Sequence, residues 1–468
     1  MGPSRVRSWG ARWSVVAAAA LLLAAPAGAV ELGARPPEHR PPLLAHGKAA
    51  ATPAADRRAA EMLASLASQR GRLPVIVELA EDEAEADPGI RRGRQRAFLD
   101  RVGGGGAAPV LFQSLPFVSL QADPLTLRRI LADPQVVSVQ EDAIHRPALV
   151  QSTDRIDAEK AWASPLNLTG AGQVVAVLDT GADKNHPMLL GKVVSEACYS
   201  SNVSGQTTSL CPGGGTSSTA VGSGVNCSIS SCFHGTHVAS IAVGQSAATT
   251  PGSGVAPGAQ LVSIQVFSRS NSGPVAWTSD IIRGLERVLV LVPVLAQDGV
   301  KIAAVNLSLG GGGYSGTCDS VQPALTTAIK NLRAAGVATV VAAGNNGWTG
   351  KISSPACIGD AIAVGSTGDT TDAVSSFSNL STTVDVMAPG QSITAAVPGT
   401  GYGTYNGTSM ATPHVAGAWA LLREARPGAS VAQIESALET SGVMVARRNV
   451  RAPRIDVDNA LLALGPGS

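Results

Sequence analysis

The chain has 468 residues, and its 35 Lys and Arg balance 34 Asp and Glu to a formal net charge of +1. This balance gives no electrostatic basis for a nucleic-acid or anionic-membrane partner. Hydrophobic residues make up 44% and charged residues 15% of the chain, which excludes wholesale disorder and predicts a large buried core. At the usual ~150 residues per domain, the length allows about three domains.

Residues 1–29 have the order of a secretory signal peptide. A start containing three arginines precedes an apolar run at residues 15–25, and the small residues Ala27-Gly28-Ala29 follow. The run is shorter than the roughly 20 residues of a membrane-spanning helix, so cleavage is favoured over a membrane anchor. No other segment qualifies as a transmembrane helix. We therefore expect a secreted protein, extracellular or periplasmic, without membrane attachment after signal cleavage.

Cysteine usage agrees with export. An even number of cysteines in an exported chain suggests disulfides, although six of them allow 15 pairings. Four lie in one Gly/Ser-rich segment, so we expect two bridges there and a third joining Cys318 to Cys357. Zinc is the alternative for Cys227, Cys232 and His234, but their spacing is not that of a C-x-x-C pair. The six cysteines are Cys198, Cys211, Cys227, Cys232, Cys318 and Cys357.

The segment between the signal and residue 147 divides into a leader and a small unit. Residues 30–72 are a Pro- and Ala-rich leader with a short helix expected at 54–69. Residues 73–147 carry the pattern strand, helix, strand, strand, helix, strand, which is the order of a ferredoxin-like α+β domain. An ordinary independent domain is the alternative. The predicted elements are strands 75–79, 110–112, 117–121 and 136–140, and helices 90–102 and 124–133.

The rest of the chain alternates apolar strands with helices. Such strands are apolar on both faces, which predicts a mostly parallel sheet covered by helices on both sides, an α/β fold. Ligands in such folds bind beyond the carboxyl ends of the strands, so polar residues at those ends are candidate site residues. The predicted strands are 174–178, 261–266, 303–307, 337–342 and 361–364, and the helices include 279–290 and 323–335.

Two polar residues follow predicted strands. Asp179 ends the first one, where a carboxylate is costly unless a partner satisfies it. Asn345, after a later strand, can donate to an oxyanion without adding a charge. The alternatives are a turn-forming Asp and a turn Asn before Gly.

Two further candidates lie at predicted helix starts. His234 begins a run of small apolar residues, and an imidazole has the pKa that a general base requires. His237 could compete for that role, but we expect it to point into the packing. Ser409 lies at or just before a helix N-terminus, because Pro413 is tolerated only in the first turn. Backbone N–H groups there favour negative charge; the alternative is an ordinary N-cap serine.

Together these segments resemble the subtilisin-like serine peptidases, the subtilases. The resemblance covers about residues 151–465 and implies a three-layer α/β fold over residues 151–468. It implies peptide-bond hydrolysis through an acyl-enzyme, with Asp179, His234 and Ser409 catalytic and Asn345 in the oxyanion hole. The matching motifs, in the family's chain order, are Asp179-Thr180-Gly181, the heptad from His234, Gly344-Asn345, and Gly407-Thr408-Ser409-Met410-Ala411.

The resemblance also assigns binding segments and a propeptide. Ser308-Leu309-Gly310-Gly311 is expected to bind peptide substrates as an edge strand, opposite residues 273–275. Residues 342–344, including Gly344, and residues 353–355 are expected to line the specificity pocket. Residues 73–147 resemble an inhibitory propeptide that acts as a folding chaperone. We expect its removal by a cut between Ile144 and Ser152, leaving a monomer.

Three departures from the family pattern stand out. Ser240 replaces the usual Gly, residues 196–231 form a longer insert, and residues 245–254 lack the oxygens of the family's calcium loop. We therefore predict no metal site and no cofactor for the chemistry, and leave structural calcium open. One alternative function is a catalytically inactive binding protein on the same scaffold. The other is a nucleotide-binding protein, disfavoured because no G-x-x-x-x-G-K-[ST] motif is present.

Overall fold

The computed structural model describes residues 44–45, 63–81, 87–103, 109–142, 144–147, 152–246 and 252–465. The expected signal peptide and most of the leader lie outside these residues. Of the helix expected at 54–69, the described part is helical over residues 63–70. We call the described residues from 44 to 142 the small unit and those from 152 to 465 the large unit.

The small unit has the expected βαββαβ order. Its antiparallel sheet runs β1-β5-β2-β4-β3, with β1 added at one edge, which is the ferredoxin-like arrangement. Both helices begin at prolines preceded by a capping aspartate: Asp87 accepts from Gly89 N–H and Asp123 from Thr126 N–H. The elements are β1 (Leu44–Ala45), β2 (Leu73–Leu79), α2 (Pro88–Val102), β3 (Val110–Leu111), β4 (Phe117–Ala122), α3 (Pro124–Ala132) and β5 (Val136–Glu141).

The large unit is built on a ten-stranded sheet of order β10-β8-β11-β7-β14-β16-β18-β19-β23-β22. The neighbours from β8 to β23 pair in parallel, and the two edge strands are antiparallel. The predicted α/β class is therefore confirmed. The strands are β7 (Gln173–Asp179), β8 (Val193–Tyr199), β10 (Ser217–Ser218), β11 (Gln260–Gln265), β14 (Lys301–Leu307), β16 (Ala338–Ala342), β18 (Ile362–Gly368), β19 (Val386–Gln391), β22 (Val443–Arg447) and β23 (Val450–Arg454).

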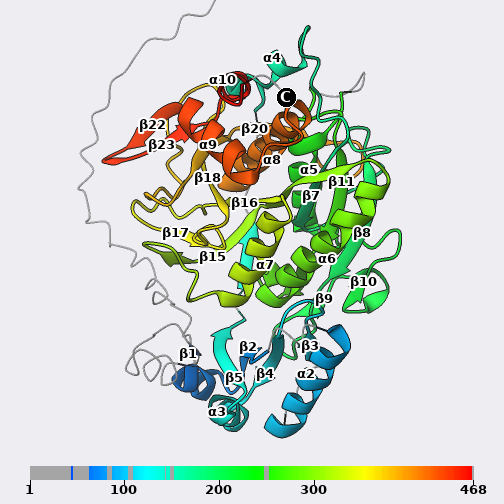
Figure 1. Ribbon diagram of the computed structural model, residues 1–468, viewed down its shortest axis with the longest axis vertical. Helices are drawn as coiled ribbons and strands as arrows, with labels where there is room; N and C mark the ends of the chain where they lie inside the picture. The colour runs from blue at the N-terminus through cyan, green and yellow to red at the C-terminus, as the bar shows by residue number, and fades with distance from the viewer. Residues whose placement is uncertain are drawn as a thin grey trace, which may run out of the picture. The chain divides into compact units, whose positions relative to one another are not determined.

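Helices cover both faces of this sheet, which explains why its central strands are apolar throughout. In β7, Val174 and Leu178 join the core beneath α6 (Thr278–Gln297) and α7 (Pro323–Ala334), which lie side by side (Figure 1). Val175 and Val177 face the opposite core, which contains residues of α5 (His234–Val243) and α8 (Thr408–Ala425). Alternate side chains of each strand are thus buried on opposite sides.

Helix α6 extends seven residues beyond the predicted end at Val290. It continues through Pro293 to Gln297. Leu291 and Leu295 lie on either side of the proline and are buried in the core. Their packing compensates for the missing backbone hydrogen bond, so the proline does not end the helix.

The remaining elements are shorter. A second, antiparallel sheet has the order β17-β15-β6-β13-β12-β9, and β20 forms a hairpin with β21. These elements are β6 (Ile144–Pro147), β9 (Thr208–Ser209), β12 (Phe267–Ser270), β13 (Gly273–Trp277), β15 (Leu309–Tyr314), β17 (Ile352–Ser354), β20 (Ile393–Ala396), β21 (Tyr402–Tyr405), α4 (Ala158–Trp162), α9 (Val431–Ser441) and α10 (Val457–Ala463), with 3-10 turns η2 (Asp154–Ile156), η3 (Pro212–Gly214) and η4 (Ser230–Phe233).

The small unit caps two helices of the large unit. Neither α6 nor α7 has a capping side chain from its own N-cap residue. The Asp142 carboxylate accepts from Ser279 N–H at 2.9 Å, and Gln140 Oε1 lies 3.4 Å from Ala324 N. The sheet face away from α2 and α3 contributes Ile76 to the core beneath α6 and α7. Apolar burial and helix capping therefore join the two units.

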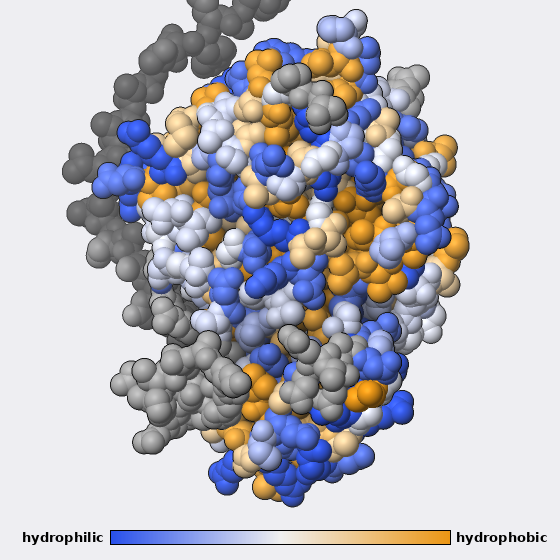
Figure 2. Space-filling view, viewed as in Figure 1, coloured by the Kyte–Doolittle hydropathy of each residue, from blue (hydrophilic) through white to orange (hydrophobic). Residues whose placement is uncertain are grey.

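Within the described residues, no helix is both long enough and apolar enough to cross a membrane. Polar and apolar surface is interspersed over the face of the molecule shown in Figure 2.

Candidate active site

The carboxyl ends of three adjacent parallel strands bring the predicted residues to one edge of the large sheet. Strand β14 lies between β7 and β16. Asp179 is the last residue of β7, Ser308 follows β14, and Asn345 follows β16 at a distance of three residues. His234 and Ser409 lie in the first turns of α5 and α8, which contact each other. This edge is where parallel α/β folds bind their ligands.

Asp179 and His234 form a buried pair. His234 Nδ1 lies 2.7 Å from Asp179 Oδ1, and the two residues are 1% and 0% exposed, respectively. Because the carboxylate accepts, the imidazole proton is on Nδ1 and Nε2 is the basic nitrogen. Asp179 Oδ1 also accepts from Thr180 N–H at 2.7 Å, while Oδ2 has no hydrogen-bond partner in the described part of the chain. A protonated imidazole is therefore the charge that best compensates this carboxylate.

Ser409 is the second residue of α8 and is buried. Its hydroxyl donates to the Ser308 carbonyl at 2.9 Å, its only hydrogen bond to a described residue. No hydrogen bond therefore joins this hydroxyl to the His234 imidazole in this conformation. A turn about the Cα–Cβ bond of Ser409 would redirect the hydroxyl, because serine has three staggered positions at that bond.

The position of Pro413 corrects one prediction. Pro413 was expected in the first turn of its helix, but α8 begins at Thr408, which places the proline in the second turn. A proline has no N–H for the carbonyl four residues earlier, here that of Ser409. The Ser308 hydroxyl donates to that carbonyl at 2.5 Å instead. The lost helical bond is thus replaced, and α8 can start earlier than its sequence suggests.

Asn345 is held by its side-chain oxygen. Asn345 Oδ1 accepts from Thr408 N–H at 2.8 Å and from Thr408 Oγ1 at 3.0 Å. Its amide nitrogen therefore remains the donor end of the side chain, next to the residue that precedes Ser409. Gly344 has φ 100°, and a Cβ there would lie 2.3 Å from Ser353 Oγ, so this turn requires glycine.

The predicted substrate strand is paired with a segment of the same chain. Strand β6 lies between β15 and β13, antiparallel to both. Leu309 is opposite Pro147 and Gly310 is opposite Arg146, while Ala276 of β13 is opposite His145. On one side of β6 the paired residues, Leu309 and Gly310, belong to the predicted segment. On the other side they are Ala276 and Trp277, whereas residues 273–275, expected on that side, pair with β12 instead. An extended backbone thus lies between two strands, as peptide binding by strand addition requires.

Comparison with known proteins identifies the family. The subtilase family model matches residues 170–453. The chain belongs to the subtilase family. The extracellular serine proteinase of Thermus sp. (strain Rt41A) is 35% identical over 381 residues, 78% of this chain and 81% of that protein. The alkaline protease of Alkalihalobacillus alcalophilus is 35% identical over 345 residues, 72% of this chain and 77% of that protein. Subtilisin E of Bacillus subtilis (strain 168) is 33% identical over 343 residues, 72% and 78% of the two chains.

This subtilase is therefore a serine-type endopeptidase, and the nucleotide-binding alternative is wrong. Its expected specificity-pocket segments lie next to each other. Ser353 N–H donates to the Ala343 carbonyl at 2.9 Å, and Gly311 of β15 is opposite Ser354 of β17. A Cβ on Gly310 would lie 3.0 Å from the Ser354 carbonyl oxygen, so β17 packs directly against the predicted substrate strand.

Sequence reasoning missed Asn379. This fully buried side chain donates to the Ala343 carbonyl at 3.0 Å and accepts from Asn346 N–H at 3.0 Å. It thereby fixes the turn that carries Gly344 and Asn345. The surrounding Ser-rich loop carries no periodic signal that could have indicated this role.

Two other buried histidines, His237 and His414, have pKa values that burial lowers. His237 bonds to the Gly403 carbonyl, and burial lowers its pKa to about 3, which fits the structural role expected for it. His414, which sequence reasoning missed, bonds to the Met410 carbonyl and accepts from Ser152 N–H at 2.7 Å. Burial lowers the pKa of His414 to about 4. Both imidazoles are therefore neutral at pH 7.

The expected Cys318–Cys357 bridge and the two bridges expected within the insert are confirmed. The pairing within the insert, which the sequence left open, is Cys198–Cys211 and Cys227–Cys232. Cysteines in a bridge are not free thiolate ligands, so the zinc alternative for Cys227 and Cys232 is wrong. Ser240, the departure from the family glycine, accepts from Ala396 N–H at 3.0 Å and donates to the His237 carbonyl at 2.8 Å. Its hydroxyl thus links α5 to β20.

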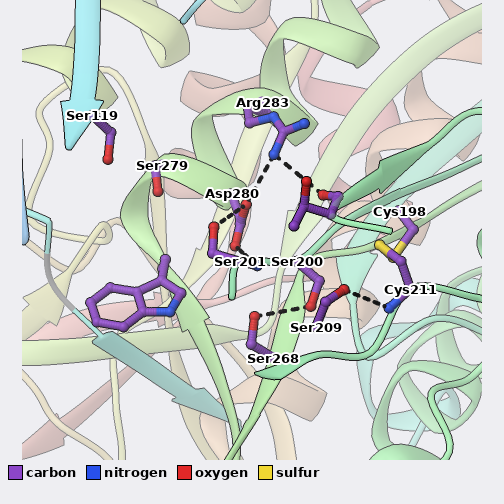
Figure 3. A network of polar contacts seen from close by, with 12 residues as sticks. Ser119, Cys198, Ser200, Ser201, Ser209, Cys211, Ser268, Ser279, Asp280 and Arg283 are labelled. Atoms are coloured by element: carbon purple, nitrogen blue, oxygen red, sulfur yellow. Dashed lines mark hydrogen bonds and ion pairs between the residues drawn. A yellow bond between two sulfur atoms is a disulfide. The ribbon is translucent and has the colours of Figure 1, made fainter. Parts of the chain in front are cut away.

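The insert is held to α6 and β12 by polar contacts (Figure 3). Asp280 of α6 accepts from Ser201 N–H at 2.8 Å and Ser201 Oγ at 3.1 Å. Ser200 Oγ lies 2.9 Å from Ser268 Oγ of β12. The insert is therefore anchored on the outer part of the large sheet, beside the Cys198–Cys211 bridge.

Three carboxylates gather elsewhere, with ligand oxygens within 4.8 Å of one another: Asp385, Glu435 and Glu439. Asp385 immediately precedes β19, which places the group at the opposite edge of the sheet from Ser409. Burial raises the pKa of Asp385 to about 7, and Arg333 pairs with Glu435. These interactions reduce the repulsion within the cluster.

Proposed function

We propose that Asp179, His234 and Ser409 form the catalytic triad of a secreted, self-processing endopeptidase. The buried hydrogen bond between Asp179 and His234, at the strand edge that also holds Ser409, is the observation that carries this proposal. Ser409 Oγ attacks the scissile carbonyl carbon while His234 Nε2 accepts the hydroxyl proton. His234 then gives that proton to the leaving amine, and water hydrolyses the resulting acyl-enzyme.

Asn345 and the first turn of α8 stabilise the oxyanion in this proposal. Thr408 holds the oxygen end of the Asn345 amide, which leaves the NH₂ group as a donor. Ser409 N–H lies in the first turn of α8, where helical geometry provides no intrahelical acceptor. Two donors without added charge are suited to the negative oxygen of a tetrahedral intermediate.

The substrate in this proposal is an extended peptide or protein segment bound in the place of β6. Ser308, Leu309 and Gly310 lie along one side of that place and β13 along the other. Because strand pairing uses backbone groups, affinity comes from the main chain and selectivity from the side-chain pockets. Gly344 belongs to the turn beside the specificity pocket.

Residues 73–147 act in the proposed mechanism as an inhibitor and folding chaperone. Support comes from the caps on α6 and α7 and from β6, which occupies the substrate place. On the other side of the expected cut, His414 holds Ser152 N–H. The bond cut between Ile144 and Ser152 therefore belongs to a segment with an anchor at each end.

Export is supported by the order of residues 1–29 and by the similarity to a protease of Thermus that is named extracellular. The mature protein is then a secreted monomer without a membrane anchor. The inactive binding protein is disfavoured, because Asp179, His234, Asn345 and Ser409 are all present.

The Ser409→Ala variant tests the proposal directly. We expect it to lose peptide hydrolysis almost entirely and to accumulate as a precursor containing both units, because the nucleophile is gone. Peptide hydrolysis, the size of the secreted product and its N-terminal sequence are the measurements. Labelling by a serine-directed phosphonate, located by peptide mapping, should find Ser409 in the unmutated enzyme and no label in the variant. Normal self-cleavage by Ser409→Ala would contradict the assignment.

A further inference from the structure

We infer that the loop closed by the Cys227–Cys232 disulfide positions Asp179 and His234 relative to each other. This inference rests on the catalytic roles proposed above for those two residues. The loop ends two residues before His234, and its hydrogen bonds lead to the residue next to Asp179. The bridge is thus a positioning element for the reaction, as well as a contributor to stability.

Thr180 connects the loop to the pair through four hydrogen bonds. Its N–H donates to Asp179 Oδ1 at 2.7 Å, and its carbonyl accepts from Cys227 N–H at 2.8 Å. Its hydroxyl donates to the Cys232 carbonyl at 3.2 Å and accepts from Gly235 N–H at 2.8 Å. One residue therefore bonds to Asp179, to both cysteines and to the residue after His234.

Gly181 packs backbone against backbone with the segment just before the loop and with the start of α5. A Cβ on Gly181 would lie 2.0 Å from the Val225 carbonyl oxygen, and one on Gly235 would lie 2.2 Å from the Gly181 carbonyl oxygen. Ala182 N–H donates to the Gly224 carbonyl at 2.9 Å. Because no side chain separates these backbones, a displacement of the loop is transmitted directly to Asp179 and His234.

The start of α5 depends on this arrangement. Its N-cap residue, Phe233, makes no side-chain capping bond, so the Thr180 hydroxyl supplies an acceptor for the first turn. The disulfide holds the Cα atoms of Cys227 and Cys232 at 5.2 Å, which fixes the two ends of the loop against Thr180. Without the bridge, the Thr180 carbonyl and hydroxyl would bond to two independently moving segments.

The Cys198–Cys211 bridge of the same insert provides a matched control. It joins β8 to the turn before η3, and its neighbours are Gln265 and Ser209 (Figure 3 labels Cys198, Cys211 and Ser209). None of the four Thr180 hydrogen bonds involves either of its cysteines. Its sequence separation of 13, against 5 for Cys227–Cys232, means that it restrains the unfolded chain more strongly.

The experiment compares two double variants of the secreted, self-processed enzyme: Cys227→Ala with Cys232→Ala, and Cys198→Ala with Cys211→Ala. The kcat and KM for a short peptide are measured per active site titrated with a serine-directed phosphonate, and Tm is measured on the same samples. We expect the first variant to lose about tenfold or more in kcat at nearly unchanged KM, because small misplacements of catalytic groups lower turnover strongly. The second should show the larger loss of Tm and a kcat within about twofold of the unmutated enzyme.

Thr180 gives a second test that leaves both bridges intact and decides the question if the first double variant is not secreted. Thr180→Val should lower kcat, whereas Thr180→Ser, which retains the hydroxyl, should restore most of it. The inference is overturned if kcat follows Tm across the variants, or if Thr180→Val and Thr180→Ser are equally active. Failure of the phosphonate to label Ser409 in the unmutated enzyme would instead overturn the proposed function.

Discussion

The carbonyl of Ser409 has an unusual hydrogen-bond donor. Pro413 removes the helical N–H that would normally reach this carbonyl, and the Ser308 hydroxyl takes its place. Asn306 Nδ2 in turn donates to Ser308 Oγ at 2.9 Å. The backbone of the proposed nucleophile is thus tied to the end of β14 by two side chains.

Removal of the Ser308 hydroxyl should therefore destabilise the enzyme. We expect Ser308→Ala to lower the free energy of unfolding by about 1–3 kcal/mol, because it leaves the Ser409 carbonyl buried without its donor. Thermal unfolding of the phosphonate-inhibited enzyme is the measurement. Thr412→Val is the control: its hydroxyl bonds to the Thr408 carbonyl, which the helix itself can satisfy. An equal effect of the two variants would contradict this explanation.

In the proposed mechanism, the Asn345 side chain combines an oxyanion donor, its amide NH₂, with a structural acceptor, its amide oxygen. Asn345→Asp retains an oxygen for Thr408 but loses the amide donor, whereas Asn345→Leu loses both. Both variants should lose about 10²–10³-fold in kcat, which is the loss that removal of the equivalent donor causes in subtilisin itself. Only the Leu variant should also lose Tm. Near-normal kcat in Asn345→Asp would exclude the amide as a donor.

The proposed site residues could be found in the sequence because each interrupts an apolar pattern. Asp179 and Asn345 are polar residues after buried strands, and His234 begins an apolar helix. Asn379 and His414 could not be found in this way. Their main hydrogen bonds involve the Ala343 carbonyl and Ser152 N–H. Every residue has such backbone groups, so the residue types do not indicate which of them a side chain will bond.

At the scale of elements, the small unit contacts the large unit by capping the N-terminus of α6. Asp142 accepts from Ser279 N–H and from the Ser119 hydroxyl, and both Asp142 and Ser279 are buried. Burial raises the pKa of Asp142 to about 6, and that of nearby Asp280 to about 7. Glu141 raises the pKa of Asp142 further, and Arg283 lowers that of Asp280.

If the small unit is released after self-cleavage, as proposed, its release should therefore accelerate as the pH rises. Once separated, Asp142 regains solvent and its pKa returns towards the usual ~3.9. Between that value and about 6, the complex holds a proton that the separated units do not, so acid pH favours association. Dissociation measured by gel filtration at pH 5 and pH 8 should differ by about tenfold in affinity, because pH 5 lies only about one unit below the pKa of Asp142 in the complex.

The Asp142→Asn variant is the control for this prediction. An Asn side chain can still accept from Ser279 N–H but cannot titrate, so its dissociation should depend less on pH. The same pH dependence in both proteins would assign the effect to other groups.

The predicted strands and helices lie within a few residues of the observed ones, apart from the end of α6. The sequence did not predict β8, β19 or α9, nor the shortest strands. Strands β9, β10 and β17 have two or three residues each, too few to show a period. The end of α6 was missed because burial of Leu291 and Leu295 outweighs the proline between them. Local sequence does not contain this tertiary contribution.

At the scale of the whole molecule, two buried imidazoles make the fold sensitive to acid. The pKa of His237 is lowered to about 3 and that of His414 to about 4, mainly by burial. In the unfolded chain both return towards ~6.5. As the pH falls below that value, the unfolded state binds protons that the folded state does not bind, so the free energy of unfolding decreases.

The mature enzyme, inhibited by phosphonate, should therefore have a lower Tm at pH 4.5 than at pH 7. For His414 alone, the change from ~6.5 to about 4 corresponds to roughly 3 kcal/mol at most. Between pH 7 and pH 4.5, the Tm of His414→Gln should fall by less than the Tm of the unmutated enzyme, even if the variant is less stable at both pH values. An unchanged acid sensitivity would show that other groups control it.

The antiparallel pairing of β6 with β13 and β15 has a consequence for timing. If the peptide is cut beyond Pro147, every ladder bond of β6 survives, and Ser152 stays tied to α8 on the other side. Cleavage of the precursor and the onset of hydrolysis of other peptides are then separate events with different rates. Gel electrophoresis would show both cleavage products during a lag in which a peptide-hydrolysis assay still detects no activity. The length of that lag would depend on how slowly β6 dissociates from β13 and β15.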